Sequence, residues 1–199
     1  MRRVVVVAVA AGALLALGAT VGAALEGHSS EASVSVGQTP NAVDIGFSQD
    51  MIVHHEQAVL MAQLVRNRTK DPKIAALAAG IEDDQLLDVG ALRGYLALWH
   101  APMLPAGPPM QWMADHVAMT TMPGMATTAQ LNALRTATGP ALDRMFLQLM
   151  LRHHDGGQVM LADATAHAGV DVVRALAARM AFDQRQESQT IAALLASLK

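Results

Sequence analysis

Beyond residue 43 the apolar positions recur at helical spacing, and the interruptions fall at a few polar, Pro or Gly sites. Within 44–66 the apolar residues occupy one arc of roughly 120° on a helical wheel, wide enough to face a core. Asp71-Pro72 and Gly139-Pro140 are typical helix starts, because proline is tolerated in the first turn of a helix. Strand signals are absent. The pattern predicts an all-α fold, an antiparallel four-helix bundle made of two hairpins. The hairpins are expected at 44–99 and 140–198, with a connection over 100–139.

A different pattern precedes this bundle domain, which is expected to span 44–199. Arg2 and Arg3 are followed by an uncharged, mostly apolar run from Val4 to Leu25. The run is typical of a signal peptide, and it also has the roughly 20 residues that a membrane anchor needs. Residues 1–25 are therefore predicted to be one or the other, and 26–43 a flexible linker. Both interpretations place the bundle outside the cytoplasm, in the periplasm, the cell envelope or the medium.

The two expected hairpins are similar to each other. Shifting the chain by 99 residues aligns positions 44–88 with 143–187 without a gap and gives 13 identities. The identities include two His-His pairs, and Asp88 aligns with Glu187. This self-similarity predicts a tandem duplication of one helical hairpin.

Polar residues interrupt the predicted core at matching levels of both hairpins. The helical wheel places the His-His pairs on the inward stripe, level with Asp84 or Gln85 and with Asp88 across the first hairpin. A buried polar group costs about 1–3 kcal/mol unless it is satisfied. Hydrogen-bonded core polar residues, or solvated positions, are one explanation. Metal binding is favoured, because imidazoles and thioethers are metal ligands and a carboxylate often orients a ligating histidine. Core packing explains Met61 and Met160 equally well. The expected ligands are Met51, His54, His55, Met61, Met150, His153, His154 and Met160, supported by Gln85, Asp88, Gln184 and Glu187.

The connection is rich in methionine. Residues 100–125 hold six of the 13 Met together with five Pro, and the proline density argues against a long helix there. Soft thioether ligands select Cu(I) over Zn(II), Mg(II) or Ca(II). A second metal site is therefore expected here, with apolar covering of the bundle or docking of a partner as alternatives. Its ligands would be His116, Met119, Met122 and Met125.

Composition excludes several classes of function. The chain has no Cys, which rules out disulfide scaffolds, thiol nucleophiles, zinc fingers and iron–sulfur clusters. Its formal charge is -3 without a basic cluster, so nucleic acid is not an expected partner. Di-iron enzymes of ferritin-like folds use Glu-x-x-His pairs and several carboxylates, and no such pair occurs here. An enzymatic activity is not favoured.

Four segments carry a resemblance to a known family. FSQDMIVHHEQAVLMAQLV and FLQLMLRHHDGGQVMLADA resemble the His-His helix of the bacterial DUF305 family, and IEDDQLLD and MAFDQRQE resemble its Gln-x-x-Glu helix. The resemblance covers Asp44 to Leu198. It implies a ferritin-like, exported bundle associated with copper or silver, and metal roles for the His and Met residues of both hairpins. Asp88 stands where the family tends to have Glu, and its shorter side chain has less reach.

These observations favour a non-enzymatic extracytoplasmic protein that binds copper, as Cu(I) or Cu(II), for sequestration, transfer or tolerance. Silver is expected to act as a surrogate, and zinc or iron is less favoured. A copper-transfer protein is the expected protein partner, and contact with a membrane is expected only through an uncleaved N-terminal segment. The alternatives are a ferritin-like metal-dependent oxidoreductase and a metal-free helical interaction module. The sequence does not define the oligomeric state.

Overall fold

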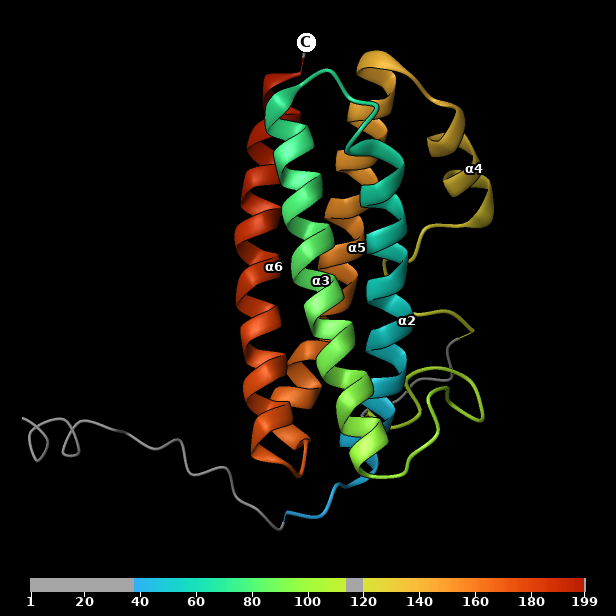
Figure 1. The fold of residues 1–199 in the computed structure, drawn as a ribbon, viewed down its shortest axis with the longest axis vertical. Helices are drawn as coiled ribbons and strands as arrows, with labels where there is room; N and C mark the ends of the chain where they lie inside the picture. The colour runs from blue at the N-terminus through green and yellow to red at the C-terminus, as the bar shows by residue number, and fades with distance from the viewer. Residues whose placement is uncertain (1–37, 114–119, 199) are drawn as a thin grey trace, which may run out of the picture. The chain divides into compact units, whose positions relative to one another are not determined.

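The structure is a computed structural model that describes residues 38–113 and 120–198. Over these residues it is all helical, with no strand, which confirms the predicted class (Figure 1). The long helices are α2 (Ala42–Val65), α3 (Pro72–Leu98), α5 (Gly139–His167) and α6 (Asp171–Ser197), and a short helix, α4 (Thr128–Thr136), lies between the two pairs.

Local sequence explains where the helices begin. The Asn41 side chain caps α2 by accepting hydrogen bonds from the backbone N–H groups of Val43 and Asp44. The Asp44 carboxylate in turn accepts a hydrogen bond from the backbone N–H of Asn41 at 2.7 Å. Asp71 caps α3 in the same way, with Pro72 in the first turn. These caps satisfy N–H groups that a helix leaves unpaired at its start.

The short helix α4 corrects the expected architecture. Residues 100–139 are expected to be a connection between the hairpins, with no long helix over 100–125, and a short helix, α4, occupies its second part. A capping box between Thr127 and Gln130 starts α4, and the fully buried Leu134 fixes it to the bundle. The capping box that predicts this helix is local and follows the proline-rich stretch. The composition of that stretch argues against a helix and therefore hides the start of α4.

Each long helix packs along its partner in the hairpin, and α2 packs against α5 across the centre. One apolar cluster contains Met51 from the start of α2 and Met160 from the end of α5, and a second contains Met61 and Met150. The two helices are therefore antiparallel. The clusters lie on either side of a polar level at the middle of the four long helices.

The predicted apolar run Val4–Leu25 and linker residues up to 37 lie outside the described residues. Within the described part of the chain, no helix combines the length and apolarity that crossing a membrane requires.

Candidate metal centre

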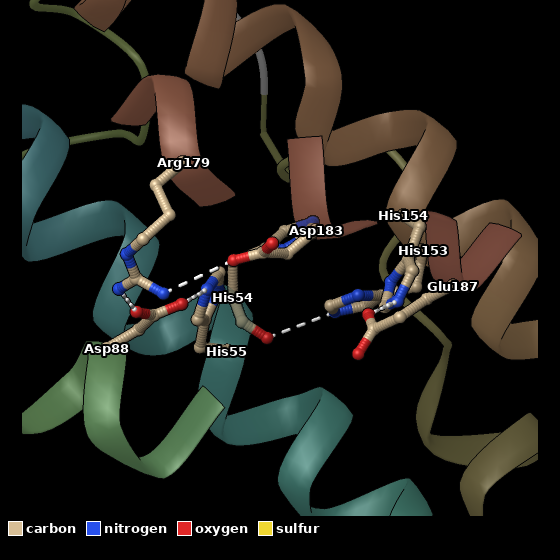
Figure 2. A network of polar contacts seen from close by, with 8 residues as sticks. All are labelled: His54, His55, Asp88, His153, His154, Arg179, Asp183 and Glu187. Atoms are coloured by element: carbon tan, nitrogen blue, oxygen red, sulfur yellow. Dashed lines mark hydrogen bonds and ion pairs between the residues drawn. The ribbon is translucent and has the colours of Figure 1, made fainter. Parts of the chain in front are cut away.

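The middle of the bundle holds four histidines, all completely buried. His54 and His55 come from α2 and His153 and His154 from α5, so both sequence-predicted pairs meet at one level (Figure 2). The rings of His54 and His153 stack with centroids 3.8 Å apart and planes inclined by 34°. Gln85 of α3 and Gln184 of α6 are buried at the same level. We call these four histidines and two glutamines the His layer.

The central pair, His54 and His153, has defined tautomers. His54 Nε2 lies 3.2 Å from the carbonyl oxygen of Pro123, and His153 Nε2 lies 3.0 Å from the carbonyl oxygen of His54. Because a carbonyl oxygen only accepts, each Nε2 must carry the proton and donate it. Nδ1 of a neutral imidazole then has a free lone pair. The backbone therefore fixes which ring nitrogen is available to a ligand.

The outer pair, His55 and His154, faces carboxylates. His154 Nε2 lies 2.6 Å from Glu187 Oε2, a strong hydrogen bond. His55 Nε2 lies 3.4 Å from Asp88 Oδ2 without hydrogen-bond geometry. Asp88 and Glu187 thus lie beside His55 and His154 as predicted, but only Glu187 forms a short hydrogen bond with its histidine.

The His layer is unusual in how many of its polar atoms lack a partner. The Nδ1 atoms of all four histidines, and both amide atoms of Gln85 and Gln184, are buried without a hydrogen bond. A buried unsatisfied group costs about 1–3 kcal/mol, and native structures contain few of them. A concentration of eight such atoms at one level indicates that something else binds there.

Burial also controls the charge of the central pair. Removal from water, followed by the charge of His55, lowers the pKa of His54 from 6.5 to about 3. Desolvation and then the charge of His54 hold the pKa of His153 well below its usual value. Both rings are therefore neutral at physiological pH, which is the form that binds metals.

A glycine allows α5 to approach this pair closely. A Cβ added to Gly157 would lie 3.2 Å from both His54 Cε1 and Gln184 Oε1, and 3.7 Å from His54 Nδ1. The repeat-equivalent position is Ala58. A larger residue would thus crowd the ring edge that carries the free nitrogen.

The hairpin methionines take positions above and below the His layer. Met51 and Met160 belong to one buried cluster and Met61 and Met150 to the other, and all four are inaccessible to solvent. Each cluster adjoining the His layer therefore contains one thioether from α2 and one from α5.

The connection contacts the His layer at Pro123. The carbonyl of Pro123 contacts His54, and a Cβ on Gly156 would lie 2.4 Å from that carbonyl, so only glycine allows this approach. Met122 and Met125 both line an open cavity of about 560 Å³ between α2 and the connection, and its described lining residues include no histidine. His116 and Met119, the other members expected for this second site, lie outside the described residues.

Two features differ from the sequence analysis. The sequence predicts Asp84 or Gln85 level with the histidines inside the bundle, and the structure buries Gln85 but leaves Asp84 exposed. Partial desolvation of the carboxylate, followed by the charges of Glu187, Asp183 and Asp88, raises the pKa of Asp84. Sequence analysis also missed Arg179, which binds Asp88 and Asp183 (Figure 2). A comparison of the repeats could have found it, because Arg179 aligns with Gly80.

Over the described residues, no group of three or more His, Cys, Asp or Glu side chains is arranged to hold one metal ion. A metal site in the His layer must therefore combine imidazoles with other ligands, such as thioethers or amides, or rearrange when the ion binds.

Comparison with known proteins identifies the family. Residues 44–195 match the family described as Domain of unknown function (DUF305), and the chain belongs to this family. A DUF305 crystal structure from Streptomyces coelicolor, which carries a secreted-protein designation, is 40% identical with a TM-score of 0.72, covering 77% of this chain and 91% of that one. A DUF305 fragment from Deinococcus radiodurans is 28% identical with a TM-score of 0.68, covering 80% and 99%.

A more distant likeness concerns the fold alone. CopM in its Cu(II)-bound form is 22% identical with a TM-score of 0.62, and the match covers 78% of this chain and 97% of CopM. CopM has also been solved in a Cu(I)-bound form. Comparison with curated proteins gives no match.

Proposed function

We propose that this protein is a non-enzymatic copper-binding protein that sequesters the ion or passes it on. The observation that carries the proposal is the set of four buried imidazole Nδ1 atoms without hydrogen-bond partners. Such a set costs stability in the metal-free protein, and metal ions bound at these imidazoles would offset that cost. The copper ion is here the cargo of the protein.

The donor chemistry supports copper. Neutral imidazoles from His54 and His153 present free lone pairs, and methionine thioethers lie in the clusters above and below them. Imidazole suits Cu and Zn, whereas thioethers select Cu(I). Among the described residues, the carboxylates that face the histidines of the His layer are Asp88 and Glu187, fewer than a di-iron centre uses. We therefore favour copper over iron, and a binding role over an oxidoreductase.

The relatives support the same proposal. CopM shares the fold and binds copper as Cu(II) and as Cu(I), and the Streptomyces coelicolor relative carries a secreted-protein designation. We extend both properties to this chain: a ferritin-like bundle that acts outside the cytoplasm, exported through residues 1–25. Met122 and Met125, with His116 and Met119, are proposed as a second, thioether-based Cu(I) site. The proposed protein partner is a copper-transfer protein.

Metal binding to purified protein tests the proposal. Cu(I), Cu(II), Zn(II) and Fe(II) are offered separately, and bound metal is measured by elemental analysis after desalting. His54→Asn with His153→Asn removes the free imidazole nitrogens of the central pair while keeping polar side chains, and should sharply reduce uptake by the His layer. The matched control replaces the exposed His100 and His167 by Asn and should bind normally. No copper uptake by the unmodified protein would contradict the proposal and favour a metal-free interaction module.

The second site is tested separately. Replacing Met119, Met122 and Met125 by Leu keeps similar bulk but deletes the sulfur atoms. In the His54→Asn, His153→Asn background this change should remove the remaining Cu(I) and leave the helical circular dichroism signal intact. Unchanged Cu(I) uptake after all five substitutions would contradict both site assignments.

A further inference from the structure

The two outer His–carboxylate pairs are equivalent in the repeat but not in geometry. His154 Nε2 lies 2.6 Å from Glu187, whereas His55 Nε2 lies 3.4 Å from Asp88 and makes no hydrogen bond. Both histidines are fully buried. Their difference therefore comes from the carboxylates and from what else binds them.

Arg179 binds only one of the two carboxylates. Its guanidinium donates to Asp88 Oδ1 and, at 3.2 Å, to Asp183 Oδ2. In the other hairpin the equivalent position is Gly80, and a Cβ placed there would have open space around it. Over the described residues, Glu187 forms no ion pair with an Arg or Lys. Asp88 is thus shared between a histidine and an arginine, while Glu187 serves its histidine alone.

This sharing affects the ligand atom of His55. A carboxylate that accepts the Nε2 proton of an imidazole raises the electron density at Nδ1 and fixes the ring. An arginine on the same carboxylate withdraws part of its charge and holds it in another direction. Asp88 is also one carbon shorter than Glu187. Both effects weaken the support of His55 relative to that of His154.

We propose that Arg179 is a positioning residue that makes the His55–Asp88 side and the His154–Glu187 side of the His layer unequal as metal sites. Acting through Asp88, it lowers the affinity of the His55 side, so that the His154–Glu187 side binds copper first. This inference rests on the proposed copper-binding function. An unequal pair would allow one ion to be retained while a more weakly held ion is passed on.

The test compares Arg179→Ala with a charge-matched control. Arg185→Ala also removes an exposed arginine from α6, but Arg185 donates to Gln158 and not to the carboxylates of the His layer. Cu(I) is titrated against a competing chelator. The unmodified protein should show two classes of affinity, and Arg179→Ala should tighten the weaker class by about 10-fold, the low end of effects from supporting hydrogen bonds. Arg185→Ala should leave both classes unchanged.

A double substitution separates positioning from simple charge repulsion. In the Asp88→Asn background, Arg179→Ala should have no further effect, because its route to His55 is already removed. A full gain in that background, an equal gain from Arg185→Ala, or a single affinity class in the unmodified protein would overturn the inference.

A metal-free readout keeps this inference distinct from the proposed function. In the ¹⁵N NMR spectrum of the histidine rings, the Nε2 proton of His154 should show a hydrogen bond to a carboxylate and that of His55 should not. Arg179→Ala, and independently Asp88→Glu, should make the His55 signal resemble that of His154. If the protein binds no copper but these spectra behave as expected, the function is wrong and the positioning role stands. Unchanged His55 spectra in both variants would overturn the positioning role.

Discussion

The buried polar residues on two sides of α2 differ in whether their side-chain atoms have hydrogen-bond partners. On the side that meets the connection, Asp50 is almost fully buried and accepts hydrogen bonds from the backbone N–H of Met110 at 2.7 Å and from Trp112 Nε1 at 2.8 Å. On the inward side, His54 and His55 are equally buried. His54 Nε2 also reaches Pro123 of the connection, but the Nδ1 atoms of both histidines have no partner.

Other residues of the outer face follow the same rule. Gln57 holds Ala126 with both amide atoms, donating to its carbonyl at 3.0 Å and accepting from its N–H at 2.6 Å. Gln49 donates to the carbonyl of Pro102 at 2.7 Å. These side chains supply hydrogen-bond partners for backbone N–H and C=O groups of the connection, which has no regular secondary structure at these points to pair them. Burial alone therefore does not distinguish the two sets of polar residues, whereas the unpartnered ring nitrogens of His54 and His55 do.

The comparison is tested most strongly by Asp50→Ala. The substitution leaves the N–H of Met110 and the indole N–H of Trp112 without their acceptor, and Met110 already has the unfavourable φ of 65°. We expect a loss of about 2–4 kcal/mol in the free energy of unfolding. Urea denaturation measures it. Copper binding by the His layer should persist under native conditions, and its loss with the fold intact would contradict the separation of the two faces.

Acid should lower the stability of the folded protein through the buried histidines on the inward side of α2. The folded protein holds the pKa of His54 at about 3, below the value of 6.5 in the unfolded chain. The unfolded state therefore binds more protons below pH 6.5, and stability falls as the pH decreases from 6.5 toward 3. At pH 5 the expected loss from His54 is about 2 kcal/mol in the metal-free protein.

Urea denaturation between pH 7 and pH 5 measures this loss. His54→Gln should flatten the dependence, and the exposed control His100→Gln should preserve it. The contribution of Asp50, on the outer face, to the pH dependence of stability has the opposite sign. Burial raises the pKa of Asp50, so its protonation favours the folded state. A stability that is equal at both pH values would show that the central histidines are not the acid-sensitive group.

The smallest expected effect has the reverse sign. Gln184→Met removes two unsatisfied buried amide atoms from the His layer and keeps similar volume. We expect the metal-free protein to become more stable by about 1 kcal/mol, while copper affinity decreases. The matched outer-face change, Gln57→Met, should destabilise the protein because both of its amide atoms have partners. A loss of stability in both variants would mean that Gln184 has a structural partner.

Sequence alone determined the helical class, the family and the inward direction of the two His-His pairs. These properties depend on local periodicity and on motifs within single helices, so they can be read from neighbouring residues. The 99-residue repeat further indicated that His54 and His153 occupy equivalent positions. The short reach of Asp88 was also expected from its side chain, and the 3.4 Å separation from His55 agrees with it.

Only the tertiary structure decided which atoms of the site are free. The carbonyl that fixes the His54 tautomer comes from Pro123, 69 residues away, and the arginine that shares Asp88 comes from Arg179, 91 residues away. The outward position of Asp84 likewise depends on how α3 is rotated against α6. Helical periodicity defines a face to within an arc, whereas hydrogen bonding requires positions accurate to a few tenths of an ångström. That accuracy arises only when the helices and the connection pack together.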